Sequence, residues 1–201
     1  MVKADCGGCE GCSQCCHGMG NSIILDPYDV YRMTTGMGKS MQELLAASVE
    51  LNVVDGVILP NLKMQGTEEA CAYLDEEGRC SIHPYRPGIC RLFPLGRYYE
   101  NGGFSYFLQT GECAKENRSK IKVSKWIDTP DLTRNQQFTL QWHDLLHAME
   151  ERLTGEDEGK QREENLLLLR LFYLLPYEGT IDFYTQFTER MEHWNGQNGQ
   201  I

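Results

Sequence analysis

The spacing of hydrophobic and polar residues is clearly helical only in the last third of the chain. From Thr129-Pro130, a capping residue followed by proline, apolar residues recur every three or four positions. This period predicts three helices, over about 130–153, 160–175 and 180–194.

Two shorter helices are predicted earlier in the chain by their capping residues. Asp26-Pro27 places an N-cap before proline, which is favoured at the first helical position, and predicts a helix over about 27–34. Ser40-Met-Gln-Glu43 has the form of a capping box, in which hydroxyl and carboxylate each bind a backbone N–H that the helix leaves unpaired. We expect this second helix to run to about Leu51.

Strand and turn patterns occupy the middle of the chain. Ser22–Leu25 is a predicted short strand, and Val53–Leu59 is another because it is rich in β-branched residues. The residues from Cys71 to His83 have the pattern of a β-hairpin whose turn is Asp75-Glu-Glu-Gly78. Such a hairpin would bring Cys71 and Cys80 close together.

A second hairpin is predicted from Arg97–Glu100 and Phe104–Leu108, which flank the turn Asn101-Gly-Gly103. Together with the helices that follow, this order of elements indicates an α+β protein. We expect a cysteine-rich domain of short β-hairpins and helices over residues 1–125, and a helical C-terminal extension over 126–201 packed on it. The length of 201 residues suits this arrangement better than two full domains.

The charge balance argues against a nucleic-acid partner. The chain has 29 Asp and Glu against 19 Lys and Arg, a net charge of -10, and no basic stripe. A membrane span is not expected, because the longest apolar stretch, Leu166–Leu175, is too short and contains Arg170. The start of the chain lacks the apolar run of a secretory signal, so we expect a cytoplasmic protein.

Nine cysteines are the strongest chemical signal in the sequence. Their positions are Cys6, Cys9, Cys12, Cys15, Cys16, Cys71, Cys80, Cys90 and Cys113. A reducing compartment and an odd number both argue against a disulfide scaffold. Burial as small apolar residues would account for a lone cysteine, but not for the crowded start of the chain. Metal binding is the interpretation that remains.

The spacing of the first cluster is typical of a metal site. Cys9-Glu-Gly-Cys12-Ser-Gln-Cys15-Cys16 places sulfurs three residues apart, which lets successive thiolates converge on one centre. Adjacent side chains diverge, so Cys15 and Cys16 either serve different centres or one of them is structural. A tetrahedral zinc ion and a [4Fe–4S] cluster each need about four thiolates, so the chain holds either two centres or spectator cysteines. Both accept such ligands, and the crowding favours iron.

Charged and imidazole side chains near the cysteines are further candidates. Arg86 and Arg91 flank Cys90, where a guanidinium would donate hydrogen bonds to sulfur, although Arg86-Pro87 could equally brace a turn. His17 and His83 lie near the cysteines in sequence and are candidate metal ligands, although His83, two residues before Tyr85 in the Pro-rich turn, could instead pair with backbone carbonyls.

Two blocks of the sequence together resemble a known family. The run CEGCSQCC at residues 9–16 is followed by GRCSIHPYRPGICRLFPLG at residues 78–96 and then by Cys113. In this order the blocks resemble the CxxCxxCC family of zinc- or iron-chelating domain proteins, the YkgJ-like cysteine cluster proteins. The resemblance spans about residues 9–113 and does not cover the helical tail.

The resemblance implies metal chelation by eight cysteines. They are Cys9, Cys12, Cys15, Cys16, Cys71, Cys80, Cys90 and Cys113, with Cys6 an extra upstream residue. The implied function is to hold an iron–sulfur cluster, [4Fe–4S] in its simplest form, or iron, for electron transfer, iron handling or sensing. A structural zinc-binding interaction module is one alternative. A likeness in cysteine pattern to the flagellin lysine N-methylase adds a second, a cluster-dependent methyl-transfer enzyme. No catalytic residue and no protein partner can be named from the sequence.

Overall fold

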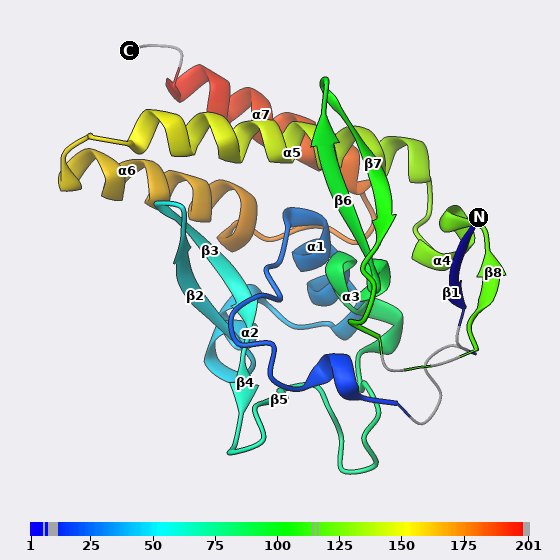
Figure 1. Ribbon diagram of the computed structural model, residues 1–201. Coiled ribbons are helices and arrows are strands. Elements are labelled where there is room, and N and C mark those ends of the chain that lie inside the picture. Colours follow the sequence, from blue (N-terminus) through cyan, green and yellow to red (C-terminus); the bar gives the residue numbers. More distant parts are fainter. Residues whose placement is uncertain (6, 8–11, 114, 116, 199–201) are drawn as a thin grey trace.

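Short hairpins and small helices form one side of the molecule and longer helices the other (Figure 1). This computed structural model describes residues 1–5, 7, 12–113, 115 and 117–198. The α-helices in these residues are α1 Pro27–Met37, α2 Met41–Ala47, α3 Gly88–Leu92, α4 Val123–Ile127, α5 Leu132–Leu153, α6 Glu158–Leu169 and α7 Phe183–Asn198. Single 3₁₀ turns cover Gln14–Cys16 and His83–Tyr85, and a π-helical turn covers Arg170–Leu174.

The strands pair two by two, and every pair is antiparallel. The pairs are β1 Val2–Asp5 with β8 Ser119–Ile121, β2 Val49–Val54 with β3 Val57–Leu62, β4 Met64–Gln65 with β5 Ala70–Cys71, and β6 Leu95–Glu100 with β7 Gly103–Leu108. Helices and small antiparallel pairs together confirm the predicted α+β class.

Local capping decides where α1 and α2 begin. The Asp26 carboxylate accepts the Asp29 N–H at 2.8 Å, and the Asp29 carboxylate accepts the Asp26 N–H at 3.3 Å. Ser40 and Glu43 exchange the same pair of bonds at the start of α2. Both predicted helix starts are therefore confirmed. α1 ends at Met37 and is capped by Gly38, whose left-handed φ of 64° suits glycine.

The second helix ends earlier than predicted. α2 ends at Ala47, because the residues after it pair as the hairpin β2–β3. The predicted strand over 53–59 spans the end of β2, the turn and the start of β3. Asn165 of α6 holds this turn, accepting the Ile58 N–H at 2.6 Å and donating to the Gly56 carbonyl at 3.2 Å. Hydrogen bonds from α6 therefore help to stabilise the β2–β3 hairpin where the sequence predicts the end of a helix.

The strand predicted at Ser22–Leu25 is reduced to a single bridge. Ile24 pairs with Asn61 of β3, and the Leu25 N–H donates to the Pro60 carbonyl at 2.9 Å. The segment runs along β3 and leads directly into α1.

The two predicted hairpins differ in their outcome. The hairpin β6–β7 is confirmed, and Asn101 and Gly102 in its turn both have the positive φ that a tight hairpin needs. The hairpin predicted from Cys71 to His83 is only a closed loop, because Leu74 and Cys80 form one isolated bridge and β5 pairs with β4 instead.

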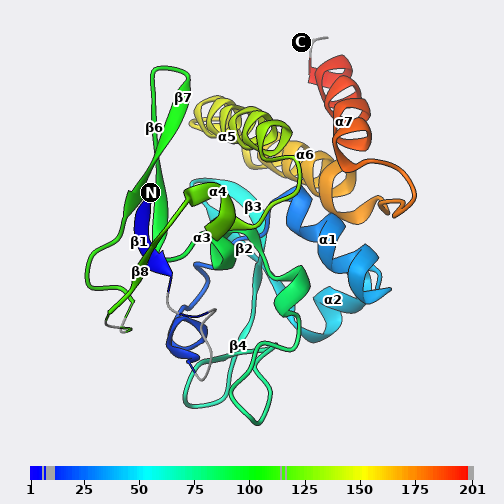
Figure 2. The same cartoon turned by 90° about the vertical axis from the view of Figure 1, so that its right-hand side faces the viewer.

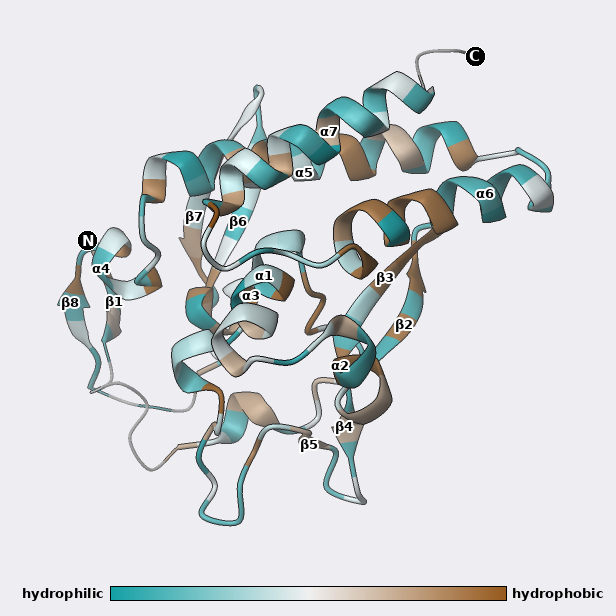
Figure 3. Cartoon of the chain, turned by 180° about the vertical axis from the view of Figure 1, so that it is seen from behind, coloured by the Kyte–Doolittle hydropathy of each residue, from teal (hydrophilic) through white to brown (hydrophobic). Residues whose placement is uncertain are grey.

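The three C-terminal helices are confirmed close to their predicted ranges, and they share one core with α1. The ring of Tyr28 on α1 lies 5.0 Å from that of Phe183 and 6.2 Å from that of Phe138. The Tyr173 hydroxyl donates to the Leu25 carbonyl at 3.0 Å. Figure 2 shows α1 between the C-terminal helices and the loops around β4, and in Figure 3 the apolar parts of β3 and α6 lie side by side. None of the helices in the described residues has the length and apolar character needed to cross a bilayer.

A smaller core lies beside β1 and β8. Leu92, Leu95 and Ile127 are buried in it, and the Trp126 indole donates to the Leu92 and Phe93 carbonyls at 3.2 Å each. α4 therefore packs against α3 across the position where the sequence predicts the end of the first domain. The division of the chain near residue 125 stays a prediction.

Candidate metal centre

Backbone pairing brings Cys16, Cys71 and Cys80 together. His17 and Ala70 form an antiparallel bridge, so Cys16 and Cys71 are neighbours across it. Cys80 forms a bridge with Leu74, whose N–H donates to the Cys71 carbonyl at 2.8 Å. The predicted proximity of Cys71 and Cys80 follows from these bonds, although the segment is a loop rather than a ladder.

The turn before Cys80 is closed by one carboxylate. Asp75 Oδ1 accepts the N–H groups of Glu77 at 3.1 Å and Arg79 at 2.7 Å, and the Asp75 N–H donates to the Arg79 carbonyl at 2.9 Å. Gly78 has a φ of 71°, and a Cβ there would lie 3.7 Å from the Ser13 hydroxyl. The turn thus packs against the cysteine-rich start of the chain.

Cys90 reaches the same region from α3. The Asp29 carboxylate on α1 accepts the N–H of Gly88, the first residue of α3, at 2.6 Å. Arg91, the residue after Cys90, lies 3.7 Å from the same carboxylate and donates to the Thr129 hydroxyl at 2.8 Å. Cys90 is thereby held between two anchored neighbours.

Five thiols influence one another's ionisation. A hydrogen bond between the side chains of Cys15 and Cys16 lowers the pKa of Cys15 to about 6 and raises the pKa of Cys16 above its usual range. Burial raises the pKa values of Cys71, Cys80 and Cys90, and negative charge on neighbouring thiols raises them further. Ionising several of these thiols together is therefore unfavourable unless a cation offsets their charge.

The two arginines that flank Cys90 in sequence have different surroundings. The Arg86 guanidinium helps to lower the pKa values of Cys15 and Cys80, so its positive charge acts on the thiols. Arg91 is buried against Asp29 instead. From the sequence, either arginine could act electrostatically on the cysteine sulfurs. The structure supports this role for Arg86, whereas Arg91 pairs with Asp29.

Both histidines near the cysteines have other partners. His17 Nδ1 lies 3.4 Å from the Glu68 carbonyl, and His83 Nε2 lies 2.8 Å from Arg86 Nη1. Burial and the charge of Arg86 lower the pKa of His83, so its ring is neutral near neutral pH. The carbonyl partner that the sequence suggested for His83 is found at His17, and His83 pairs with Arg86 instead.

Thiolate sulfurs are suitable donors for zinc or iron. In the described part of the chain, however, the side chains that carry them do not surround a common point. The described cysteines are free thiols and half-buried: Cys12, Cys15, Cys16, Cys71, Cys80, Cys90 and Cys113. Within the described ranges, no three His, Cys, Asp or Glu side chains are arranged tightly enough to hold an ion. Coordination would require the side chains to turn inward. Cys6 and Cys9 lie outside the described residues.

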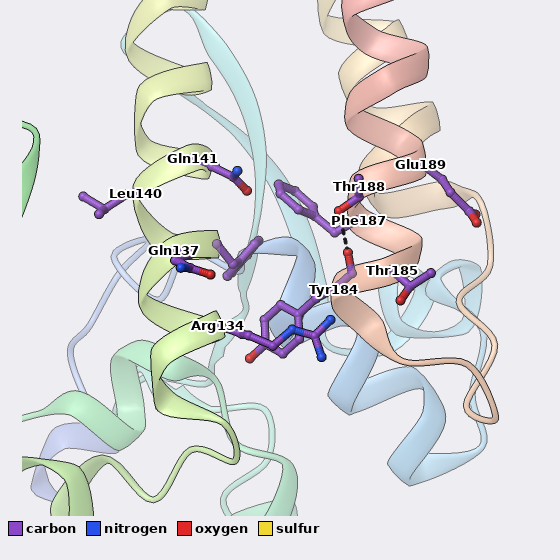
Figure 4. A pocket seen from close by; sticks show the side chains of 10 residues that line it. Arg134, Gln137, Leu140, Gln141, Tyr184, Thr185, Phe187, Thr188 and Glu189 are labelled. Atoms are coloured by element: carbon purple, nitrogen blue, oxygen red, sulfur yellow. Dashed lines mark hydrogen bonds between the residues drawn. The ribbon is translucent and has the colours of Figure 1, made fainter.

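An open groove of about 740 Å³ lies elsewhere, between α5 and α7 (Figure 4). Its lining contains no cysteine, and its side chains come from these two helices. Arg134 lies 4.6 Å from the centre of the Tyr184 ring and pairs with Asp182 at 2.6 Å. The groove is therefore not part of the candidate metal centre.

Asp29 also belongs to this region, although the sequence did not predict it as a site residue. Its signal was present, since an acid three positions after Asp26 completes a capping box. Its second role, in binding the Gly88 N–H, joins residues 59 positions apart and has no local signal.

Free thiols from several elements of an α+β scaffold supply the donor atoms that thiophilic metal ions prefer. The chain belongs to the CxxCxxCC family, whose model matches residues 8–139 and is described as a "putative zinc- or iron-chelating domain". This match confirms the family resemblance and extends it past Cys113 into α5. Comparison with curated proteins and with solved structures finds no match.

Proposed function

We propose that this chain binds zinc or iron through thiolates of its cysteine cluster. The proposed ligands come from Cys9, Cys12, Cys15, Cys16, Cys71, Cys80, Cys90 and Cys113. The observation that carries the proposal is that backbone pairing and the bond from Asp29 to α3 bring thiols from the start of the chain, β5, the following loop and α3 into one region. There the charges of neighbouring thiols raise one another's pKa values. Family membership in a zinc- or iron-chelating domain supports the same class of ligand.

The thiols differ in the pH at which they ionise, and this difference sets the role of each in metal binding. Cys15 ionises first, with a pKa of about 6, and offers the thiolate that meets an incoming cation. The thiols with raised pKa values release their protons as the metal binds. Arg86 offsets part of the negative charge that remains.

For the bound form we propose an iron–sulfur cluster, [4Fe–4S], because the cysteines are crowded at the start of the chain, with successive sulfurs three residues apart. Such a cluster would supply one-electron chemistry, which suits electron transfer, iron handling or sensing. A structural zinc module is the competing outcome, since zinc accepts the same ligands.

The test is anaerobic purification followed by metal and sulfide analysis and an absorption spectrum. Matching iron and sulfide with broad visible absorption supports the cluster. Stoichiometric zinc in a colourless sample, unchanged after anaerobic reconstitution with iron and sulfide, refutes the cluster and leaves zinc chelation.

A matched pair of serine variants tests the ligand set. Cys80→Ser removes a thiol of the convergent group and should lose bound metal, whereas Cys6→Ser should keep it, because Cys6 precedes the family match. Equal metal content in both variants and the parent would contradict the assignment of Cys80.

A further inference from the structure

One face of α1 lies against the segment that carries Arg86 and Cys90. Asp29, Arg32 and Gly36 occupy positions i, i+3 and i+7 of the helix and therefore share a face. Asp29 binds the backbone of α3, and Arg32 donates a hydrogen bond to the Pro84 carbonyl. All three positions of this face contact one segment, residues 84–91, which includes the start of α3.

Asp29 supplies the cap that α3 lacks. The N-cap residue of α3 is Pro87, which offers no side-chain acceptor, so the N–H of Gly88 would be an unpaired donor inside the protein. Asp29 Oδ1 accepts it at 2.6 Å, while Oδ2 accepts the Asp26 N–H. With both oxygens engaged and Arg91 beside them, Asp29 acts on Cys90 by placing α3 and by its charge, which raises the pKa of that thiol, and not as a metal ligand.

Gly36 leaves the space for a second contact. A Cβ at this position would overlap Cδ1 of the Tyr85 ring and lie 2.8 Å from its Cγ, so the ring lies directly on the helix backbone. Any larger residue at position 36 would displace the Tyr85 ring from this face of α1 and remove its contact with the helix.

We propose that Asp29 is a positioning residue of the thiol centre and that Gly36 assists it, the two fixing Cys90 and its loop against the other thiols. This inference rests on the proposed metal binding. α3 is five residues long, too short to be stable by itself, so its place depends on such contacts. Because α1 also lies in the main core, the helix connects the core to the metal centre.

The experiment compares Asp29→Ala, Asp29→Asn and Gly36→Ala with a matched control, Glu43→Ala. Glu43 is the corresponding capping-box residue of α2 and is exposed. Zn²⁺ affinity is measured by competition with a chromophoric chelator. Co²⁺ serves as the spectroscopic probe, because sulfur-to-cobalt charge-transfer absorption grows with the number of bound thiolates. Circular dichroism of the metal-free proteins reports folding.

Asp29→Ala should weaken Zn²⁺ binding by about 10–100-fold, the usual effect of losing a residue that orients a ligand, and should reduce the charge-transfer absorption of Co²⁺. Asp29→Asn retains an oxygen for the Gly88 N–H and should lie closer to the parent. Gly36→Ala should weaken binding while α1 becomes intrinsically more helical, a combination that simple loss of stability does not produce. Glu43→Ala should bind both ions as the parent does.

Failure of the two proposals can be told apart. A parent protein that binds neither Zn²⁺ nor Co²⁺ overturns the proposed function itself. If the parent binds, a folded Asp29→Ala with parental affinity and spectrum overturns the positioning role. Should Asp29→Ala not fold, Gly36→Ala decides, and parental affinity and spectrum in that variant overturn the inference.

Discussion

Replacing Phe138 by alanine tests whether the thiol site and the C-terminal helices unfold together. Phe138 on α5 is 2% exposed, and its ring lies 6.2 Å from that of Tyr28 on α1 and 4.8 Å from that of Phe187 on α7. Removing a buried phenylalanine ring costs about 3–5 kcal/mol. That is a large part of the roughly 5–15 kcal/mol that stabilises a typical domain.

The expected result is a fall in melting temperature of roughly 6–20 °C for a chain of this size. Thermal unfolding of the metal-free protein is followed by tryptophan fluorescence, with Trp142 and Trp194 buried in the main core, and by labelling of thiols with a maleimide. Both transitions should move together, because α1 belongs to the core and also holds the loop of Cys90. Leu166→Ala is the control, since Leu166 is 55% exposed and its loss should change stability by no more than about 0.5 kcal/mol.

The result that refutes this reasoning is a separation of the two signals. If Phe138→Ala shifts the fluorescence transition while thiol labelling keeps the parental transition, the two parts of the chain fold independently. The boundary predicted near residue 125 would then mark a unit that is stable by itself.

Three further predictions concern protons, a turn and the start of the chain. Four thiols have raised pKa values and must release protons to bind metal: Cys16, Cys71, Cys80 and Cys90. Apparent Zn²⁺ affinity should therefore rise about tenfold per pH unit for each such proton between about pH 6.5 and 8, and a flat titration would exclude them as ligands. Asn165→Ala removes two hydrogen bonds to the β2–β3 turn and should lower the free energy of unfolding in urea by about 0.5–1.5 kcal/mol for each, so parental stability would contradict this account. No side chain from Cys12 to Ser22 is buried, so stripping the metal with a chelator should speed proteolysis there, and an identical cleavage pattern with and without metal would speak against ordering by metal.

Features that depend on neighbouring residues could be predicted from the sequence. The starts of α1 and α2 follow from capping boxes whose partners are three positions apart, and the β6–β7 turn follows from Asn101-Gly102. The end of α2 could not be predicted in this way, because Leu51 suits either a helix or a strand. Pairing of β2 with β3, and the contact from Asn165 on α6, favour the strand.

By itself the sequence determined the donor atoms, thiols in a family that chelates zinc or iron, and thereby the class of cation they suit. Only the tertiary structure decided which of these thiols lie in one region. Cys16 reaches Cys71 through a bridge between His17 and Ala70, and Cys90 reaches them through the bond from Asp29 to the start of α3. These contacts join distant parts of the chain, and no local pattern encodes them, since they depend on where the shared core places α1.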